Sequence, residues 1–169
     1  VSRIIGDVVH GDPVGTPAGR RAAMEGFLHE RLFGPLGMAT ATAKFDTAGT
    51  WVGSSYVYAT AHDFARFGEL YRLDGALADG TRLLPDGWVD HARTPVAHDD
   101  ESGFDYGRHW WMWPAFPGSL AAHGYEGQFT LVVPDRGLTL VHLGKTDAAV
   151  RPGLVARLEA VVRAVPSRA

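Results

Sequence analysis

The segment Gln128-Phe-Thr-Leu-Val-Val133, followed by Pro134-Asp-Arg-Gly137 and Leu138-Thr-Leu-Val-His-Leu143, decides the fold. Its two outer parts are apolar and rich in β-branched residues, which favours strands. The residues between them form a turn signal, because proline presets φ, aspartate bonds its own backbone and glycine tolerates positive φ. A connection this short predicts an antiparallel pair.

Two further strands precede this ribbon. The stretches Tyr106-Gly-Arg-His-Trp-Trp-Met-Trp113 and Ser119-Leu-Ala-Ala-His-Gly124 have strand composition, and Gly124-Tyr-Glu-Gly127 is a second tight connection with glycine at both ends. We therefore expect one antiparallel sheet over residues 106–143. A closing helix from Pro152 to Val165 presents an apolar face, which we expect to cover the sheet near Val132, Leu140 or Leu143.

The residues before the sheet predict helices and loops. Val1, Ile4, Ile5, Val8 and Val9 have helical spacing. A second helix is predicted over 20–33, and a third opens at Thr60-Ala-His-Asp63 in the manner of a capping box. The helices of residues 20–73 are expected to stand apart from the sheet as a helical lobe. The inward side chains expected of the second and third helices are Ala23, Phe27, Leu28 and Leu32, and Phe64, Phe67, Leu70 and Tyr71.

The intervening segments carry weaker signals. Residues 39–57 show no clean period and predict irregular chain, and a short helix begins at Pro85. The polar and acidic stretch 94–103 predicts a mobile loop. The chain begins without an initiator Met or a signal-peptide pattern, and so we expect it to be cut from a larger protein. Cytoplasmic and exported bacterial locations both stay open.

Composition limits the classes of function. A chain of 169 residues with 46% hydrophobic residues can bury a core, and a net charge of −3 with a pI near 6.2 gives no electrostatic reason for nucleic-acid or membrane binding. The absence of cysteine excludes disulfides, thiolate nucleophiles and zinc–thiolate sites. No cofactor or metal is predicted.

Several isolated motifs have structural interpretations. The serines in Gly53-Ser-Ser-Tyr-Val57 resemble a nucleophile elbow, but that turn needs glycine where Val57 stands. His98-Asp-Asp-Glu101 could bind a cation, although acidic loops are usually solvated. Lys145-Thr146 is favoured as a strand exit, because Asp147 follows where a Lys-Thr-Gly motif has glycine. The tryptophans at 110, 111 and 113 suit core packing better than a ligand cage.

Four segments in order carry a family resemblance. Phe27-Leu-His-Glu-Arg-Leu-Phe-Gly-Pro-Leu-Gly-Met38 and the stretch from Gly53 to Leu70 resemble segments of serine β-lactamase-like proteins. Tyr106-Gly-Arg-His-Trp-Trp111 and Ala122-His-Gly-Tyr-Glu-Gly-Gln128 complete the series. This superfamily contains class C β-lactamases and penicillin-binding DD-peptidases. The last segment, with Leu143-Gly-Lys-Thr146, is most similar to the branch of 6-aminohexanoate-dimer hydrolase and related esterases.

The resemblance implies a mixed α/β (α+β) fold: the C-terminal portion of a β-lactamase/DD-peptidase-like domain. Residues 1–105 would be a partial helical lobe with covering loops, and residues 106–169 the antiparallel strands and C-terminal helix of the α/β lobe. The family's Ser-x-x-Lys is missing here, because Ala41 and His142 stand three residues before Lys44 and Lys145. Its Tyr motif is also missing. Both would therefore lie upstream of this chain.

The family's third motif is present in altered form. Matching Gly124 to its glycine puts Ala122 at the lysine position and His123 at the threonine position. The loss of that lysine removes the cation that holds a substrate carboxylate, which disfavours penicillins. The backbone N–H after the glycine, on Tyr125, would form half of the oxyanion hole. The resemblance adds Gln128, Ser54 and Ser55 as substrate-binding candidates, and His123 either contacts substrate or points away.

Two functions follow as expectations. The intact parent would be a serine hydrolase of amide or ester bonds, acylated at an upstream serine. The alternative is a non-catalytic member of the same fold that binds peptide, cell-wall fragments or a partner. For the isolated chain we expect no activity, and we expect self-association through an exposed sheet edge.

Overall fold

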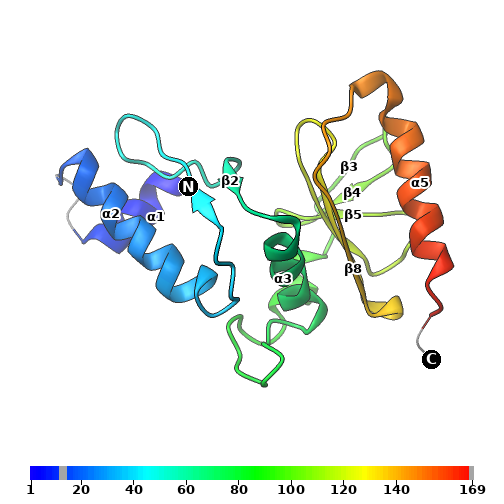
Figure 1. Cartoon of the computed structure of the whole chain (residues 1–169), viewed down its shortest axis with the longest axis horizontal. Helices are drawn as coiled ribbons and strands as arrows, with labels where there is room; N and C mark the ends of the chain where they lie inside the picture. Colours follow the sequence, from blue (N-terminus) through cyan, green and yellow to red (C-terminus); the bar gives the residue numbers. More distant parts are fainter. Residues whose placement is uncertain (12–14, 168–169) are drawn as a thin grey trace. The chain divides into compact units, whose positions relative to one another are not determined.

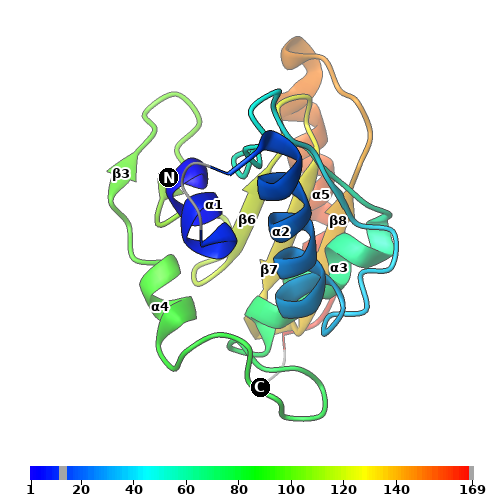
Figure 2. The ribbon, with the colours of Figure 1, turned by 90° about the vertical axis from the view of Figure 1, so that its left-hand side faces the viewer.

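The computed structural model describes residues 1–11 and 15–167, which form two compact units, Val1–Asp63 and Phe64–Ala169. The first contains α1 (Ser2–His10), α2 (Pro17–Leu28), the π-helical turn η1 (His29–Phe33) and a hairpin of β1 (Thr42–Ala43) and β2 (Val57–Tyr58). Figure 2 shows α1 beside α2. Part of the expected loop before Arg20 lies outside the described residues.

The second helix begins earlier than predicted. The Oγ1 of Thr16 accepts a hydrogen bond from the Gly19 N–H at 3.1 Å, and Pro17 occupies the first turn, where its missing N–H costs nothing. The expectation of an inward Phe27 is wrong, because this ring is 40% exposed and Met24 is buried in its place. Residues 39–57, expected to be irregular, contain β1 and an isolated antiparallel bridge between Phe45 and Trp51.

A six-stranded antiparallel sheet dominates the second unit. Its order follows the chain: β3 (Ala97–His98), β4 (Asp105–Tyr106), β5 (Trp111–Met112), β6 (Leu120–His123), β7 (Phe129–Val133) and β8 (Leu138–His142). The pairs Ala122↔Thr130 and Leu131↔Leu140 set the register of its longest strands. The predicted meander is therefore confirmed in topology. The turn before β8 is a short 3-10 helix, η2 (Pro134–Arg136), ended by Gly137 at φ 57°.

The upstream strands differ from the expectation in two places. Residues 106–113 are not one strand but β4 and β5, separated by a tight turn in which the Gly107 N–H donates to the Trp110 carbonyl at 2.8 Å. His109 adopts φ 68° there, and a Cβ at Gly107 would lie 2.2 Å from the Ala92 oxygen. The stretch predicted as a mobile loop contributes β3 to the sheet. Neither the β4–β5 turn nor β3 has a hydrophobic alternation in the sequence from which it could be predicted.

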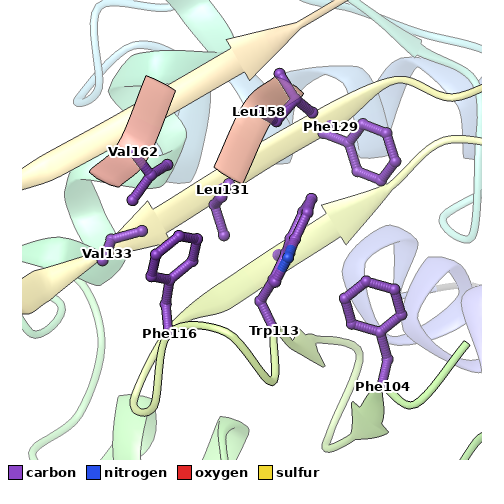
Figure 3. Close-up of a cluster of buried hydrophobic side chains, with 9 residues drawn as sticks. Phe104, Trp113, Phe116, Phe129, Leu131, Val133, Leu158 and Val162 are labelled. Atoms are coloured by element: carbon purple, nitrogen blue, oxygen red, sulfur yellow. The ribbon is translucent and has the colours of Figure 1, made fainter. Parts of the chain in front are cut away.

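One face of the sheet is covered by α5 (Arg151–Ala164), whose predicted existence and packing are confirmed. Leu158 and Val162 of this helix join a cluster with Trp113, Leu131 and Phe129, and Leu140 packs at its margin. Figure 3 shows the side chains of this cluster, without Leu140, between the helix and the strands. The Trp113 Nε1 donates to the Glu159 carboxylate at 2.9 Å, so the indole is buried with its polar atom satisfied.

The opposite face is covered by α3 (Ala61–Arg72), as Figure 1 shows. Phe67 and Tyr71 pack on a second cluster that contains Trp110, Leu120 and Val132. For α3 this corrects the prediction that the helices of residues 20–73 stand apart from the sheet, and for α2 it stays a prediction. The expected capping box is present on its Thr60 side, where the Asp63 N–H donates to the Thr60 Oγ1 at 3.4 Å. The Asp63 carboxylate also accepts from the Thr40 N–H and Oγ1.

The remaining helix is α4 (Trp88–Ala92), and a 3-10 turn, η3 (Ala148–Val150), leads into α5. The division between residues 105 and 106 describes lobes of a whole enzyme and stays a prediction. Within the described residues, no helix combines the length and apolar character needed to cross a membrane.

Candidate active site

Strand β6 sends consecutive side chains to opposite faces of the sheet. Ala122 lies on the α3 face, beside the cluster of Leu120 and Val132. His123 lies on the α5 face, where its ring stacks on Trp111 at 5.3 Å between centroids and meets Phe129 edge-on at 4.9 Å. The structure thus places His123 in an aromatic cluster and Ala122 where the resemblance puts the missing lysine. Substrate contact by either residue stays a prediction.

Burial controls the charge of His123. The surrounding rings exclude water, and with the nearby positive charge of Arg151 they lower the pKa of His123 to about 4. Its Nε2 is buried and has no hydrogen-bond partner among the described residues. Burial therefore favours the uncharged imidazole at neutral pH, half-buried against the aromatic cluster.

The turn between β6 and β7 is fixed by its own backbone. The Gly124 N–H donates to the Gln128 carbonyl at 2.7 Å, and the Gly127 N–H donates to the Gly124 carbonyl at 3.2 Å. Gly127 has φ 86°, a conformation that side chains disfavour. The predicted tight connection is present.

The Tyr125 N–H points out of this turn. In a trans peptide the C=O and the following N–H point in opposite directions. Because the Gly124 C=O faces inward to the Gly127 N–H, the Tyr125 N–H of the same peptide faces outward. Within the described part of the chain it donates to no acceptor, and Tyr125 is 94% exposed. A backbone donor is thus held free at the end of a central strand.

Side chains brace the turn from two directions. The Gln128 Oε1 accepts from the Glu126 N–H at 3.2 Å, and its Nε2 donates to the Gly144 carbonyl at 3.4 Å. Gln128 lies close under Gly124, where a Cβ would be 2.5 Å from its Oε1. Gln128 is therefore placed to support the turn.

The chain after β8 joins the same assembly. The Thr146 N–H donates to the Glu126 carbonyl at 2.8 Å. Lys145 pairs with the Glu126 carboxylate at 2.6 Å, and this hydrogen bond raises the pKa of Lys145. Arg151 donates to the Tyr125 carbonyl at 3.0 Å. Sequence reasoning missed Glu126 and Arg151; the available signal was an arginine in the first turn of a helix, where a positive charge opposes the helix dipole.

The other candidates belong to other segments of the chain. Ser54 and Ser55 are exposed in a turn closed by the Ser55 N–H and the Val52 carbonyl at 3.1 Å, within the first unit. This is not a strand-to-helix elbow, and their contact with substrate stays a prediction. His98 pairs with Asp105 at 2.7 Å, and the described residues hold no group of three or more side chains arranged to bind a metal ion.

The chain is similar to known hydrolases in sequence and in fold. No protein-family profile matches the chain. Among curated proteins, 6-aminohexanoate-dimer hydrolase of Paenarthrobacter ureafaciens is 30% identical over 112 residues, which is 61% of this chain and 28% of that protein. The chain therefore spans less than a third of this relative.

Solved structures decide the fold. A Bacillus anthracis protein, proposed to be a 6-aminohexanoate-dimer hydrolase, matches 92% of this chain with a TM-score of 0.63 and 19% identity. The fold is β-lactamase-like, as two further neighbours named as β-lactamases also show. The match covers 47% of the Bacillus protein, so this β-lactamase-like chain spans about half of it.

Two further neighbours agree with this assignment. A proposed β-lactamase of Bacteroides dorei DSM 17855 matches this chain with a TM-score of 0.55 and 17% identity. The match covers 87% of this chain and 55% of the Bacteroides chain. A β-lactamase of Mycobacterium bovis matches 83% and 60%, at a TM-score of 0.52 and 18% identity. The resemblance drawn from the sequence segments is confirmed.

Proposed function

We propose that this chain is the C-terminal part of a β-lactamase-family serine hydrolase that cleaves amide or ester bonds through an acyl-enzyme. The single observation that carries the proposal is the free Tyr125 N–H, which a braced turn presents at the end of β6. The likeness to proteins named as hydrolases supports the reaction class. The nucleophile Ser-x-x-Lys and the Tyr motif would come from upstream sequence.

The chemistry divides between the two parts of the parent. An upstream serine Oγ attacks the carbonyl carbon, and the C=O electron pair moves onto oxygen. The Tyr125 N–H would donate to that oxyanion, and Gly124 would let the substrate approach the backbone. The amine or alcohol then leaves with a proton, and water releases the acid from the serine. One such donor is typically worth about 10²–10³ in rate.

Ala122 points to the class of substrate. A methyl group replaces the cation that would hold a substrate carboxylate, and Ala122 packs beside Leu120 and Val132. An amide or ester without an essential carboxylate at that place needs no such charge. We therefore propose a small amide or ester, rather than a penicillin, as the substrate of the intact protein.

A second candidate is a non-catalytic binding protein of the same fold. It is favoured by one sequence fact: neither lysine of this chain has a serine three residues before it. The isolated chain therefore has no nucleophile of the family type. A protein whose upstream half also lacked Ser-x-x-Lys would bind peptide or cell-wall fragments without cleaving them.

Labelling the intact protein with a fluorophosphonate separates the two candidates. Covalent labelling at an upstream serine, lost when that serine is changed to alanine, supports the hydrolase. Absence of labelling, with the protein folded, supports the binding protein. We also expect this chain alone to give no turnover of p-nitrophenyl esters or nitrocefin above buffer. Turnover that disappears in Ser55→Ala would contradict that expectation.

We further propose that the isolated chain self-associates. Strand β8 is at one end of the strand order and pairs only with β7 in the described sheet. Unpaired edge groups recruit other strands. Sedimentation at micromolar concentration should show dimers or larger species, and charging the edge by Val141→Lys should reduce them. A clean monomer would sink this idea.

A further inference from the structure

We propose that Arg151 is a positioning residue that fixes the direction of the Tyr125 N–H, and this inference rests on the proposed function. Arg151 is the first residue of α5, and its Nη2 reaches out of the helix to two carbonyl oxygens. The distances are 3.0 Å to Tyr125 and 3.3 Å to Thr146. The guanidinium thereby ties the β6–β7 turn to the segment that follows β8.

Two successive peptide planes carry the argument. The Gly124–Tyr125 plane is fixed through its C=O, which accepts from the Gly127 N–H. The Tyr125–Glu126 plane is held on both edges: Arg151 donates to its C=O, and Gln128 accepts from its N–H. With both planes fixed, the φ and ψ of Tyr125 have little freedom. The outward N–H is therefore oriented before any substrate arrives.

The position of Arg151 carries two energetic costs, which its hydrogen bonds to the turn offset. A cation in the first turn of a helix meets the positive end of the helix dipole. The guanidinium also costs desolvation, since its Nε is buried and without a partner among the described residues. Two carbonyl acceptors offset these costs. Gly127 suits the turn between them, because it has φ 86° and a Cβ there would crowd the Thr146 Cβ at 3.1 Å.

An oriented donor matters because a misplaced N–H stabilises the oxyanion of the transition state poorly. Loss of the clamp should let the Tyr125–Glu126 peptide rotate, and this rotation would loosen the turn, including the long Gly127–Gly124 hydrogen bond that holds the plane of the Tyr125 N–H. Because the effect falls on charge that develops only in the transition state, it should appear in kcat and not in KM. A merely structural arginine would change stability without this division.

The test compares Arg151→Met with Arg163→Met in the intact protein. Methionine keeps the length of the side chain and removes its donors. Arg163 is the matched control, because it lies on the same helix, is more than half exposed, and contacts Glu159 at 2.9 Å and the Phe116 ring rather than the β6–β7 turn. With a p-nitrophenyl ester, Arg151→Met should lower kcat about 10- to 100-fold, with KM within about twofold. Arg163→Met should leave both within about twofold.

Hydrogen exchange gives an independent reading. The amides of residues 124–128 should exchange about tenfold faster in Arg151→Met than in wild type, while exchange in β7 stays unchanged. Arg151→Lys, which keeps the charge but loses the planar fork, should fall between the two and covers the case in which methionine prevents folding. If the intact wild type gives no turnover, the proposed function fails and exchange alone decides. Unchanged exchange and unchanged kcat in both Arg151 variants overturn the inference.

Discussion

The two faces of the sheet in the second unit are closed by different means. Under α5 the contact is made by large side chains: Trp113, Leu131 and Val162 are almost fully buried and pack against other apolar rings. Under α3 the helix backbone itself comes close to the strands. A Cβ on Gly68 would lie 2.5 Å from the Thr139 Cγ2, so the helix backbone rests directly on the strands.

The polar groups follow the same division. On the α3 face the Glu69 carboxylate accepts from the Thr139 Oγ1 at 2.6 Å and pairs with Arg72. On the α5 face the ring of His123 is enclosed by aromatic side chains and is kept neutral. Both faces therefore bury apolar side chains, and the α3 face adds a direct approach of the helix backbone to the strands. Mutations of equal size should then have unequal effects.

The largest effect should come from Leu131→Ala, which removes a fully buried side chain from the α5 face. We expect about 4 kcal/mol less unfolding free energy, because the cavity adds to the lost transfer energy. Leu143→Ala is the matched control, since Leu143 is 40% exposed, and should cost about 0.5 kcal/mol. Urea unfolding measures both. Equal losses would mean that the α5 face is not a close-packed core.

The next effect concerns acid stability. The pKa of His123 is about 4 in the folded chain and near its ordinary 6.5 when unfolded. Between these values the unfolded state binds the extra proton, so stability falls as pH falls through this window, by roughly 3 kcal/mol in all. His123→Phe should remove that loss, whereas the exposed His62→Gln should keep it. Denaturant midpoints at pH 7, 5.5 and 4 decide, and parallel curves for wild type and His123→Phe would contradict the burial argument.

The third effect should come from a methyl group added at Gly68, where α3 lies close to the strands. In Gly68→Ala the added methyl meets Thr139, and we expect a net loss of about 1–2 kcal/mol even though alanine favours helix by ~1 kcal/mol. Thr139→Ser removes the methyl that is hit while keeping the hydroxyl for Glu69. The double variant should therefore recover most of the loss. If it recovers none, the helix does not rest on Thr139, and the contrast between the faces weakens.

The smallest effect belongs to the ion pair on the α3 face. Glu69→Gln keeps the shape of the side chain and weakens its bonds to Arg72 and Thr139. Both charged groups are partly exposed, so we expect a change below about 1 kcal/mol. A double-mutant cycle with Arg72→Met isolates the coupling. Coupling well above that value would mark the pair as part of the core.

The parts of this fold that sequence predicts are those with a strong period or strong turn chemistry. The β7–β8 ribbon and its Pro134–Gly137 turn, the tight turn at Gly124 and the closing helix were all predictable from local pattern. The site position followed from a resemblance, through the glycine of a known motif. The backbone direction of Tyr125 then came from the structure.

The features that sequence missed depend on contacts distant in the chain. The strands β3, β4 and β5 have two residues each, too short to show alternation, and they exist because neighbouring strands accept them. The docking of α3 depends on a glycine facing Thr139, which lies far along the chain. Whether His123 faced substrate or core could not be read from alternation alone, because nothing local assigns the two sides of β6.

The ties at the two ends of α5 give the helix a mechanical role. At its start, Arg151 binds the turn that leads into β7; at its end, the Val165 carbonyl accepts from Arg136, in the turn that leaves β7. The helix α5 is thus hydrogen-bonded to the chain near both ends of β7. A force applied to the chain after Val165 would act on β7 through Arg136 before α5 separates from the sheet. A fusion joined to the chain after Val165 should therefore disturb β7 if it pulls and leave β7 intact if it only tethers.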